Sequence, residues 1–213
     1  MLSPERLDLM QLSWVRLLDK FGVAPADAYL LFDELVAAYE EPGRYYHNLE
    51  HLGEMLRITS RLSDFARDMP SIHLAAWYHD VIYDPKAKNN EELSAGKAAE
   101  KLSSVGIPSD VIDSIAKMIL ATKTHAGNDP DTRVLLDADL AILGADIKRY
   151  DRYAADIRRE YSWIEDSVYR PGRIGVLESF LKRDRIYHTQ RLFEMGEVPA
   201  RENIKREIDG LRG

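Results

Sequence analysis

The sequence predicts an all-α protein with a single domain. Apolar residues recur at spacings of three and four along almost the whole chain, and no segment alternates apolar and polar residues for long enough to form a strand. Proline and glycine stand between these segments, where they end helices. With 213 residues, 45% of them hydrophobic, the chain is long enough to build one core. We expect one domain over residues 1–213, with its core at about 25–190 and the terminal helices packed on it.

The helices can be placed from their stripes and breakers. Ser3-Pro4 opens the first, because proline suits the first turn of a helix. Pro42-Gly43, Asp84-Pro85 and Pro171-Gly172 are expected to break the chain. The expected helices run from Pro4 to Gly22, Pro25 to Glu41, about Asn48 past Leu62, Ile72 to about Tyr83, Glu91 to Ser104, Asp110 to Thr122, about Asp131 to Leu143, Asp146 to Glu165, Ile174 to Leu181 and Pro199 to Leu211.

Composition excludes several classes of function. Acidic residues outnumber basic ones 36 to 29, a formal charge of −7, which argues against nucleic-acid or anionic-membrane binding. No cysteine is present, so disulfides, thiolate metal sites and cysteine nucleophiles are excluded. The sequence contains no run of about 18 apolar residues, so it predicts no membrane-spanning helix. The first residues lack the pattern of a signal peptide. We expect a cytoplasmic protein.

Three short segments carry the chemistry. His47 and His51 lie four residues apart beside two tyrosines, and His79-Asp80 ends a strongly apolar helix. A third segment, residues 135–140, contains two aspartates in an apolar run. Imidazoles and carboxylates are costly to bury alone, and a shared divalent metal compensates them together. The segments therefore predict helices that converge on one ion and hydrolysis by metal-activated water.

Asp137 and Asp139 compete for one role. They lie about 200° apart on a helix, so only one of them faces inward. Asp139 shares its face with Leu135, Leu136, Ile142 and Leu143, which is the more apolar set. We therefore expect Asp139 to be the metal ligand, and Asp137 to be a supporting or salt-bridging acid.

These motifs resemble the H…HD…D signature of the HD superfamily of metal-dependent phosphohydrolases. The resemblance is carried by Tyr46-His47-Asn48-Leu49-Glu50-His51, by His79-Asp80-Val81-Ile82-Tyr83-Asp84, by Leu136-Asp137-Ala138-Asp139-Leu140 and by the stretch from Gly172-Arg173 to Tyr187. It is similar to a small bacterial branch of predicted phosphohydrolases and spans most of the chain. The resemblance implies an HD-domain-like helical bundle, hydrolysis of phosphomonoesters, phosphodiesters or nucleotides, and a metal held by His47, His79, Asp80 and Asp139.

The expected activity is therefore that of a metal-dependent phosphohydrolase. The nitrogen and oxygen ligands suit Mn²⁺, Fe²⁺, Co²⁺, Ni²⁺, Zn²⁺ or Mg²⁺. Asp80, Asp84 or His51 would transfer protons during the reaction. His51 or His125 could hold part of a second metal site. His125 could instead contact the substrate.

The expected partner is a small phosphorylated substrate, with no nucleic acid and no membrane, and a homodimer is an open alternative. The candidates to contact a phosphate are Arg44, Lys86, Lys88, Lys123 and Arg173. The alternative function is a non-catalytic metal-binding or interaction module that retains the same site. A structural site should be closed by protein ligands, whereas a catalytic one should open to a pocket.

Overall fold

The protein is all-helical in its computed structural model, which describes residues 2–213. This range contains no strand. Its first part comprises α1 (Pro4–Asp19), α2 (Pro25–Tyr39), α3 (Leu49–Arg61), α4 (Met69–Tyr78), α5 (Asn90–Ser104), α6 (Ser109–Thr122) and α7 (Pro130–Leu140). A second part comprises α8 (Ile147–Glu160), α9 (Asp166–Leu181) and α10 (Gln190–Arg212). Short 3₁₀ helices follow α3 (Ser63–Phe65) and α7 (Ala141–Gly144).

Helix α4 is the central element of the first part. Residues 74–78 are all buried, and α3, α5, α6 and α7 pack against the helix. A helix that is apolar on every side is stable only when other elements surround it. Trp77 meets Trp14 of α1 edge to face, with 5.1 Å between the ring centroids. The end of α4, with His79 and Asp80 after it, is therefore held at the middle of the molecule.

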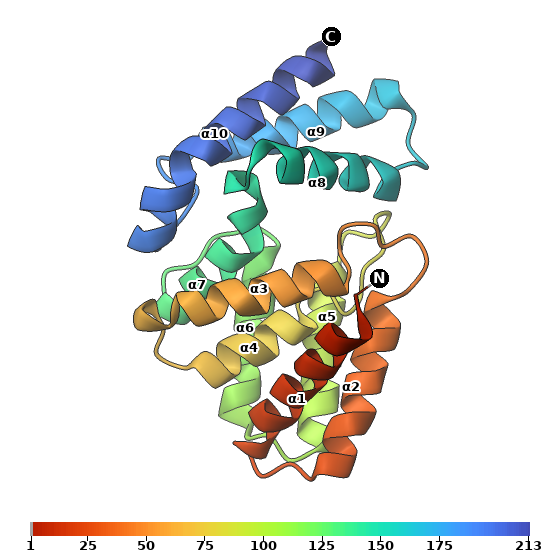
Figure 1. Ribbon diagram of the computed structural model, residues 1–213, viewed down its shortest axis with the longest axis vertical. Coiled ribbons are helices and arrows are strands. Elements are labelled where there is room, and N and C mark those ends of the chain that lie inside the picture. Colours follow the sequence, from red (N-terminus) through yellow and green to blue (C-terminus); the bar gives the residue numbers. More distant parts are fainter. Residues whose placement is uncertain (1) are drawn as a thin grey trace.

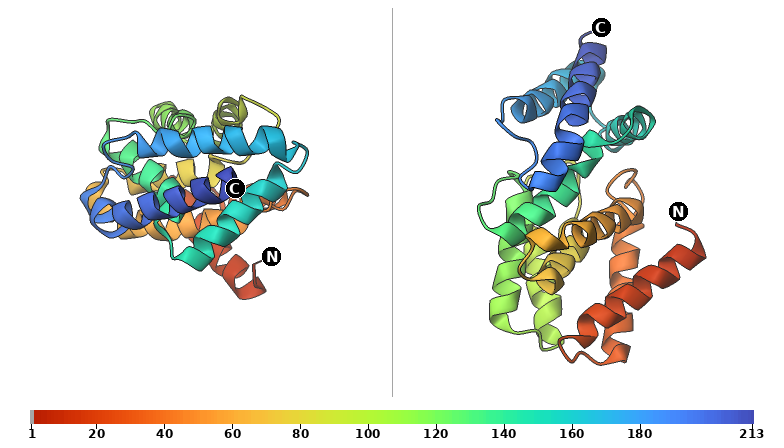
Figure 2. Two further views of the ribbon diagram at one scale, coloured as in Figure 1. Left: turned by 90° about the horizontal axis from the view of Figure 1, so that it is seen from above. Right: turned by 60° about the vertical axis from the view of Figure 1, so that its left-hand side comes forward.

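Helices α8–α10 form a layer over one end of the α1–α7 part (Figure 1). Figure 2 shows the same arrangement from two further sides. This layer has its own buried cluster, to which α7 and the 3₁₀ helix after it contribute Leu140 and Leu143. Earlier residues of α7, such as Val134 and Leu135, belong to the core of the first part. The segment 130–144 therefore joins the two parts, and the candidate site lies beside it.

Two prolines that were expected to break or begin helices lie inside them. Pro171 is within α9 and Pro199 is within α10. A proline in a helix costs about 3 kcal/mol, mainly through a lost hydrogen bond and a steric clash. Buried residues on both sides of each proline, Tyr169 and Leu177 in α9 and Gly196 and Ala200 in α10, hold the helix in place through tertiary packing.

Two further boundaries differ from the expectation. Helix α4 begins at Met69 and ends at Tyr78, so Asp80 follows the helix instead of lying on it. Helix α8 ends at Glu160, five residues before the expected end. None of the helices within the described residues is both long and apolar enough to cross a bilayer.

Candidate metal site and cavity

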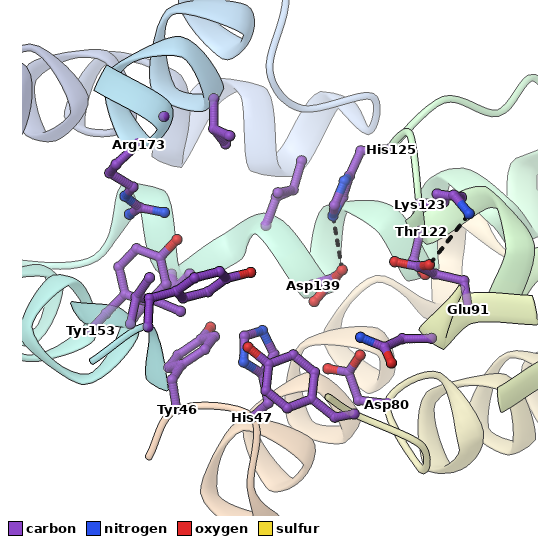
Figure 3. Close-up of a pocket in the computed structure, with 18 of the residues that line it drawn as sticks. Tyr46, His47, Asp80, Glu91, Thr122, Lys123, His125, Asp139, Tyr153 and Arg173 are labelled. Atoms are coloured by element: carbon purple, nitrogen blue, oxygen red, sulfur yellow. Dashed lines mark hydrogen bonds and ion pairs between the residues drawn. The ribbon is translucent and has the colours of Figure 1, made fainter. Parts of the chain in front are cut away.

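A cavity of about 640 Å³ lies between the two parts of the molecule. Its lining includes His47 and Asp80 from the first part, His125 and Asp139 around α7, and Arg173 from α9. Figure 3 shows these side chains approaching the cavity from different elements. The sequence motifs, which are up to 92 residues apart, are thus brought to one place.

Two histidines and one aspartate form the centre of the site. His51 Nε2 lies 3.2 Å from His79 Nε2 and 3.2 Å from Asp139 Oδ1. The distance from His79 Nε2 to Asp139 Oδ1 is 3.9 Å. Ligand atoms bound to one ion at about 2.0–2.2 Å lie roughly 3–3.5 Å from their neighbours. His51, His79 and Asp139, the first two of them buried, could therefore hold a metal ion.

Asp80 lies next to this group. Its Oδ2 atom is 2.9 Å from His79 Nε2 and 3.9 Å from His51 Nε2. The main chain around Asp80 is fixed by Arg44, whose guanidinium donates to the carbonyls of Asp80 at 2.6 Å and of Val81 at 3.0 Å. Arg44 is thus a buried residue whose Nη atoms meet backbone carbonyls and the Glu41 carboxylate. It is not among the residues that line the cavity, so the geometry does not favour our hypothesis that it contacts a phosphate.

The ring of His79 is oriented for ligation. Its Nδ1 lies 2.8 Å from the carbonyl oxygen of Ala76, to which it donates a proton in the neutral tautomer. The other ring nitrogen, Nε2, then keeps its lone pair and faces the ligand group. A hydrogen bond from the far nitrogen to a carbonyl is the usual way in which proteins fix a metal-binding imidazole.

The structure brings His51, and not the expected His47, into the group that could hold a metal ion. The sequence interpretation put His47 among the ligands, but it is His51, in the first turn of α3, that reaches His79 and Asp139. His47 lies in the loop before α3, with its ring stacked on Tyr83 at 4.2 Å between centroids. Its Nδ1 is 2.6 Å from Glu160 Oε2. Spacing alone could not decide between the histidines, because the helix begins between them.

Glu160 is the residue of the candidate site that the sequence did not reveal. Its side chain has no exposed surface. One oxygen, Oε1, accepts hydrogen bonds from the backbone amides of Tyr45, Tyr46 and His47, and the other also accepts from the Tyr83 hydroxyl at 2.8 Å. Glu160 is the last residue of a highly charged helix, so no local signal separated it from the solvated acids around it.

The choice of Asp139 over Asp137 agrees with the geometry, but the reason given for it was wrong. Asp137 is the more buried, with no exposure. Its carboxylate accepts from the amides of His188 at 2.7 Å and Thr189 at 2.6 Å, and from the Thr189 hydroxyl. Asp139 has a side chain 14% exposed because it faces the cavity. Asp137 thus ties α7 to the start of α10, and Asp139 is left for the site.

His125 contacts the same carboxylate from the other side. Its Nε2 lies 3.0 Å from Asp139 Oδ2, a contact drawn in Figure 3. The residue has a left-handed backbone, with φ of 48°. Arg183 stabilises this loop by donating to the carbonyls of Thr124 and His125, each at 3.0 Å. The structure therefore places His125 where it can orient Asp139 or meet a ligand in the cavity.

The remaining candidates are distributed differently. Asp84 lies in a turn in which its carboxylate accepts from the amide of Lys86 at 2.9 Å, and it is not among the residues that line the cavity. Lys123 does line the cavity, although its ammonium is paired with Glu92. Arg173 also lines it, with Nε 2.8 Å from Glu207 Oε1 and Nη2 3.2 Å from Oε2.

The protonation states fit a cation site. Burial lowers the pKa of His79, but the charge and hydrogen bond of Asp80 outweigh it and raise that pKa to about 9. The pKa of Asp80 is lowered, because His79 outweighs the effect of burial, and that of Asp139 is lowered by His125 and His51 against burial. Burial lowers the pKa of His51. Both carboxylates are thus favoured in the ionised form, which is the form that binds a divalent cation.

The pKa values of His47 and Glu160 are also shifted. Burial lowers the pKa of His47, but the hydrogen bond to Glu160 and the nearby carboxylates raise it overall. Burial raises the pKa of Glu160, and the hydrogen bond and charge of His47 lower it overall. The carboxylate is therefore ionised, and it favours a proton on His47 Nδ1.

Comparison with known proteins adds no assignment. No family model matches the sequence, and neither a curated protein nor a solved structure matches it. The resemblance to the HD superfamily therefore stays a prediction that depends on the motifs quoted above.

Proposed function

We propose that this protein is a metal-dependent phosphohydrolase whose ion is held by His51, His79, Asp80 and Asp139. The observation that carries the proposal is the convergence of two imidazole Nε2 atoms and two carboxylates at the wall of a large cavity. The ordered motif H…HD…D is kept in this assignment, with His51 as its first histidine. The four groups are the hard-to-borderline donors that Mn²⁺, Fe²⁺, Co²⁺, Ni²⁺, Zn²⁺ or Mg²⁺ accept.

An ion at this position would act as a Lewis acid on a phosphoryl oxygen and would lower the pKa of water. The residues of the chain would orient the metal ligands and bind the substrate. His125 holds one oxygen of Asp139, so the other can face His51. Lys88 brings positive charge to the cavity wall, where an anionic substrate would lie, and the Lys123 ammonium beside it is paired with Glu92.

His47 is the residue best placed to move a proton. Glu160 occupies its Nδ1, so Nε2 is the nitrogen that can give or take a proton, and the ring lines the cavity. Stacking on Tyr83 and the hydrogen bond to Glu160 both limit rotation of the ring. A held imidazole with a partner carboxylate is the usual arrangement of a general acid or base. We therefore assign the proton transfer to His47 instead of Asp84.

The cavity also favours catalysis over the alternative of a closed metal-binding module. A structural metal site is sealed by protein ligands, whereas Asp80 and Asp139 both line an open space large enough for a small organic ligand. This observation supports an enzyme.

Direct measurement can test the proposal. Mn²⁺ and Zn²⁺ binding is measured by calorimetry, and the loaded protein is screened against phosphomonoesters, nucleotides and cyclic dinucleotides. We expect turnover of at least one class, with loss of turnover and weaker metal binding in Asp80→Ala. Asp113→Ala, at an exposed position of α6, is the matched control and should behave as wild type. Wild-type turnover in Asp80→Ala would contradict the assignment.

A further inference from the structure

The two walls of the cavity differ in chemistry. The α1–α7 part supplies the ionisable groups, namely His47, Asp80, Lys88, Glu91, Lys123, His125 and Asp139. The α8–α9 segment supplies a wall that is mostly aliphatic and aromatic: Tyr153, Ile157, Tyr161, Ile164, Val168, Tyr169, Val176 and Phe180. A volume of about 640 Å³ is within the range that holds a whole organic ligand, and so is more than a phosphate group needs. The second wall therefore has room for the organic part of a substrate.

One row of residues along α9 defines this wall. Val168, Gly172, Val176 and Phe180 follow one another at intervals of four, and all four line the cavity. Residues at this spacing lie on one face of a helix, and twelve residues span about 18 Å. Val168 is 62% exposed and Val176 is 50% exposed, which is unusual for valines that face a cavity inside the fold. The row is an elongated apolar strip that is exposed at Val168 and Val176 and buried at Phe180.

Gly172 leaves the middle of this strip without a side chain. A Cβ atom added there would meet no other heavy atom within 4 Å. The strip therefore has no side chain between Val168 and Val176, and a larger residue at position 172 would meet open space. Gly175, on the same helix, also has open space around it, but it is not among the residues that line the cavity.

The charged group of this wall is already paired. Arg173 donates to both carboxylate oxygens of Glu207, and both side chains are at most 10% exposed. A second anionic group of a ligand would have to compete with this buried pair. The α9 wall therefore favours an uncharged and apolar ligand group, while the opposite wall favours the charged one.

We propose that the site takes phosphate esters of alcohols that carry an elongated apolar group. The phosphate lies against the ionisable wall, and the hydrocarbon lies along the strip formed by Val168, Gly172, Val176 and Phe180. The position of the phosphate depends on the function proposed above. The apolar strip is observed independently of that function.

A series of alkyl chains tests the strip in two ways. Methyl-, butyl-, hexyl- and octylphosphonate are not hydrolysed, so their binding to the Mn²⁺-loaded protein can be measured by calorimetry whether or not the protein is an enzyme. Affinity should rise about threefold to fourfold per added methylene, the factor that corresponds to about 0.8 kcal/mol for burial of one CH₂. The kcat/KM for ethyl, butyl, hexyl and octyl phosphate should rise in parallel, since these leaving alcohols differ little in acidity.

The outcomes separate the two proposals. If binding strengthens with chain length but no ester is hydrolysed, the result supports the apolar strip and contradicts the proposed phosphohydrolase activity. Hydrolysis of short polar esters with no dependence on chain length keeps the enzyme and overturns the strip. A dimer that covers α9, detected by sedimentation, together with a flat chain-length series, would also overturn it in favour of a second copy as the occupant.

Substitutions of Gly172 and Gly175 test whether the alkyl chain binds along α9. Leucine at either position improves helix propensity and meets open space, so both variants should fold. Gly172→Leu places a side chain on the strip between Val168 and Val176 and should lower the ratio of octyl- to methylphosphonate affinity at least tenfold. Gly175→Leu should keep that ratio. Equal ratios in the two variants would contradict the placement of the hydrocarbon along α9.

Discussion

Glu160 Oε2 lies 2.6 Å from His47 Nδ1, in a contact that joins the end of α8 to the loop before α3. The other carboxylate oxygen of Glu160 accepts three consecutive backbone amides of that loop. A buried carboxylate is tolerated only when its lone pairs are filled, and this one has five hydrogen bonds. The contact therefore holds a cavity-lining imidazole and fastens the α8–α10 layer to the rest of the fold.

Glu160→Gln should lower kcat strongly while leaving metal content unchanged. The glutamine amide keeps the size of the side chain, but its NH₂ group must face either the three loop amides or His47 and Tyr83, which are hydrogen-bond donors themselves. An unsatisfied buried group costs about 1–3 kcal/mol, so the free energy of unfolding should fall by that amount. Urea unfolding, metal analysis and steady-state kinetics measure the three quantities. Glu165→Gln, five residues on and exposed, is the control and should change none of them.

Asp139→Asn and Asp137→Asn should have opposite effects. Asp139→Asn removes a charged ligand, so metal content should fall, with a smaller change in the stability of the metal-free protein. Asp137→Asn puts an amide donor against the amides of His188 and Thr189, so stability should fall by about 1–3 kcal/mol while metal binding is retained in the folded fraction. If Asp137→Asn lost more metal than Asp139→Asn in the folded state, the assignment of the two acids would be wrong.

The metal-free protein should become less stable between about pH 6.5 and 9. The pKa of His79 is about 9 in the fold, where Asp80 outweighs burial, and near 6.5 in an unfolded chain. A raised pKa adds stability that is fully present below the unfolded value and is lost as the pH rises through the folded value. The loss should be on the order of 3 kcal/mol at most. Urea unfolding with a chelator present measures it.

His79→Gln is the control for this pH profile. Without the imidazole, the free energy of unfolding should lose most of its slope over the same pH range. Metal binding to the wild type should change in the opposite direction and strengthen with pH, because the ion displaces the proton from His79. A wild-type profile as flat as that of the variant would refute the proton on His79.

Gly196→Ala should destabilise the protein by about 1–3 kcal/mol, because overpacking forces buried groups to move. A Cβ atom at Gly196 would lie 2.9 Å from the ring of Tyr187, which is fully buried and donates to the Leu140 carbonyl. Gly210→Ala, on the same helix with open space around it, should be neutral or slightly stabilising. Thermal unfolding of the two variants makes the comparison. Equal melting temperatures would contradict this expectation and show that the Tyr187 ring moves to accommodate the added methyl group.

Much of the helical framework could be predicted from local sequence. The starts of α1 and α2 follow from proline at a first turn, and the start of α3 follows from Asn48, whose side chain accepts from the Glu50 amide. These features depend on residues within one turn, so they can be recognised without the fold. Pro171 and Pro199 were misjudged for the opposite reason, since packing of neighbouring residues keeps α9 and α10 continuous around them.

The sequence by itself determined the all-helical class, the motifs that carry the chemistry and the preference for nitrogen and oxygen donors. The tertiary structure alone decided that His51 instead of His47 meets His79, that Asp137 is occupied by the start of α10, and that Glu160 is part of the site. The physical reason is that residue type and spacing set local conformation and donor chemistry. Which ligand atoms meet depends on helix packing between segments far apart in the chain.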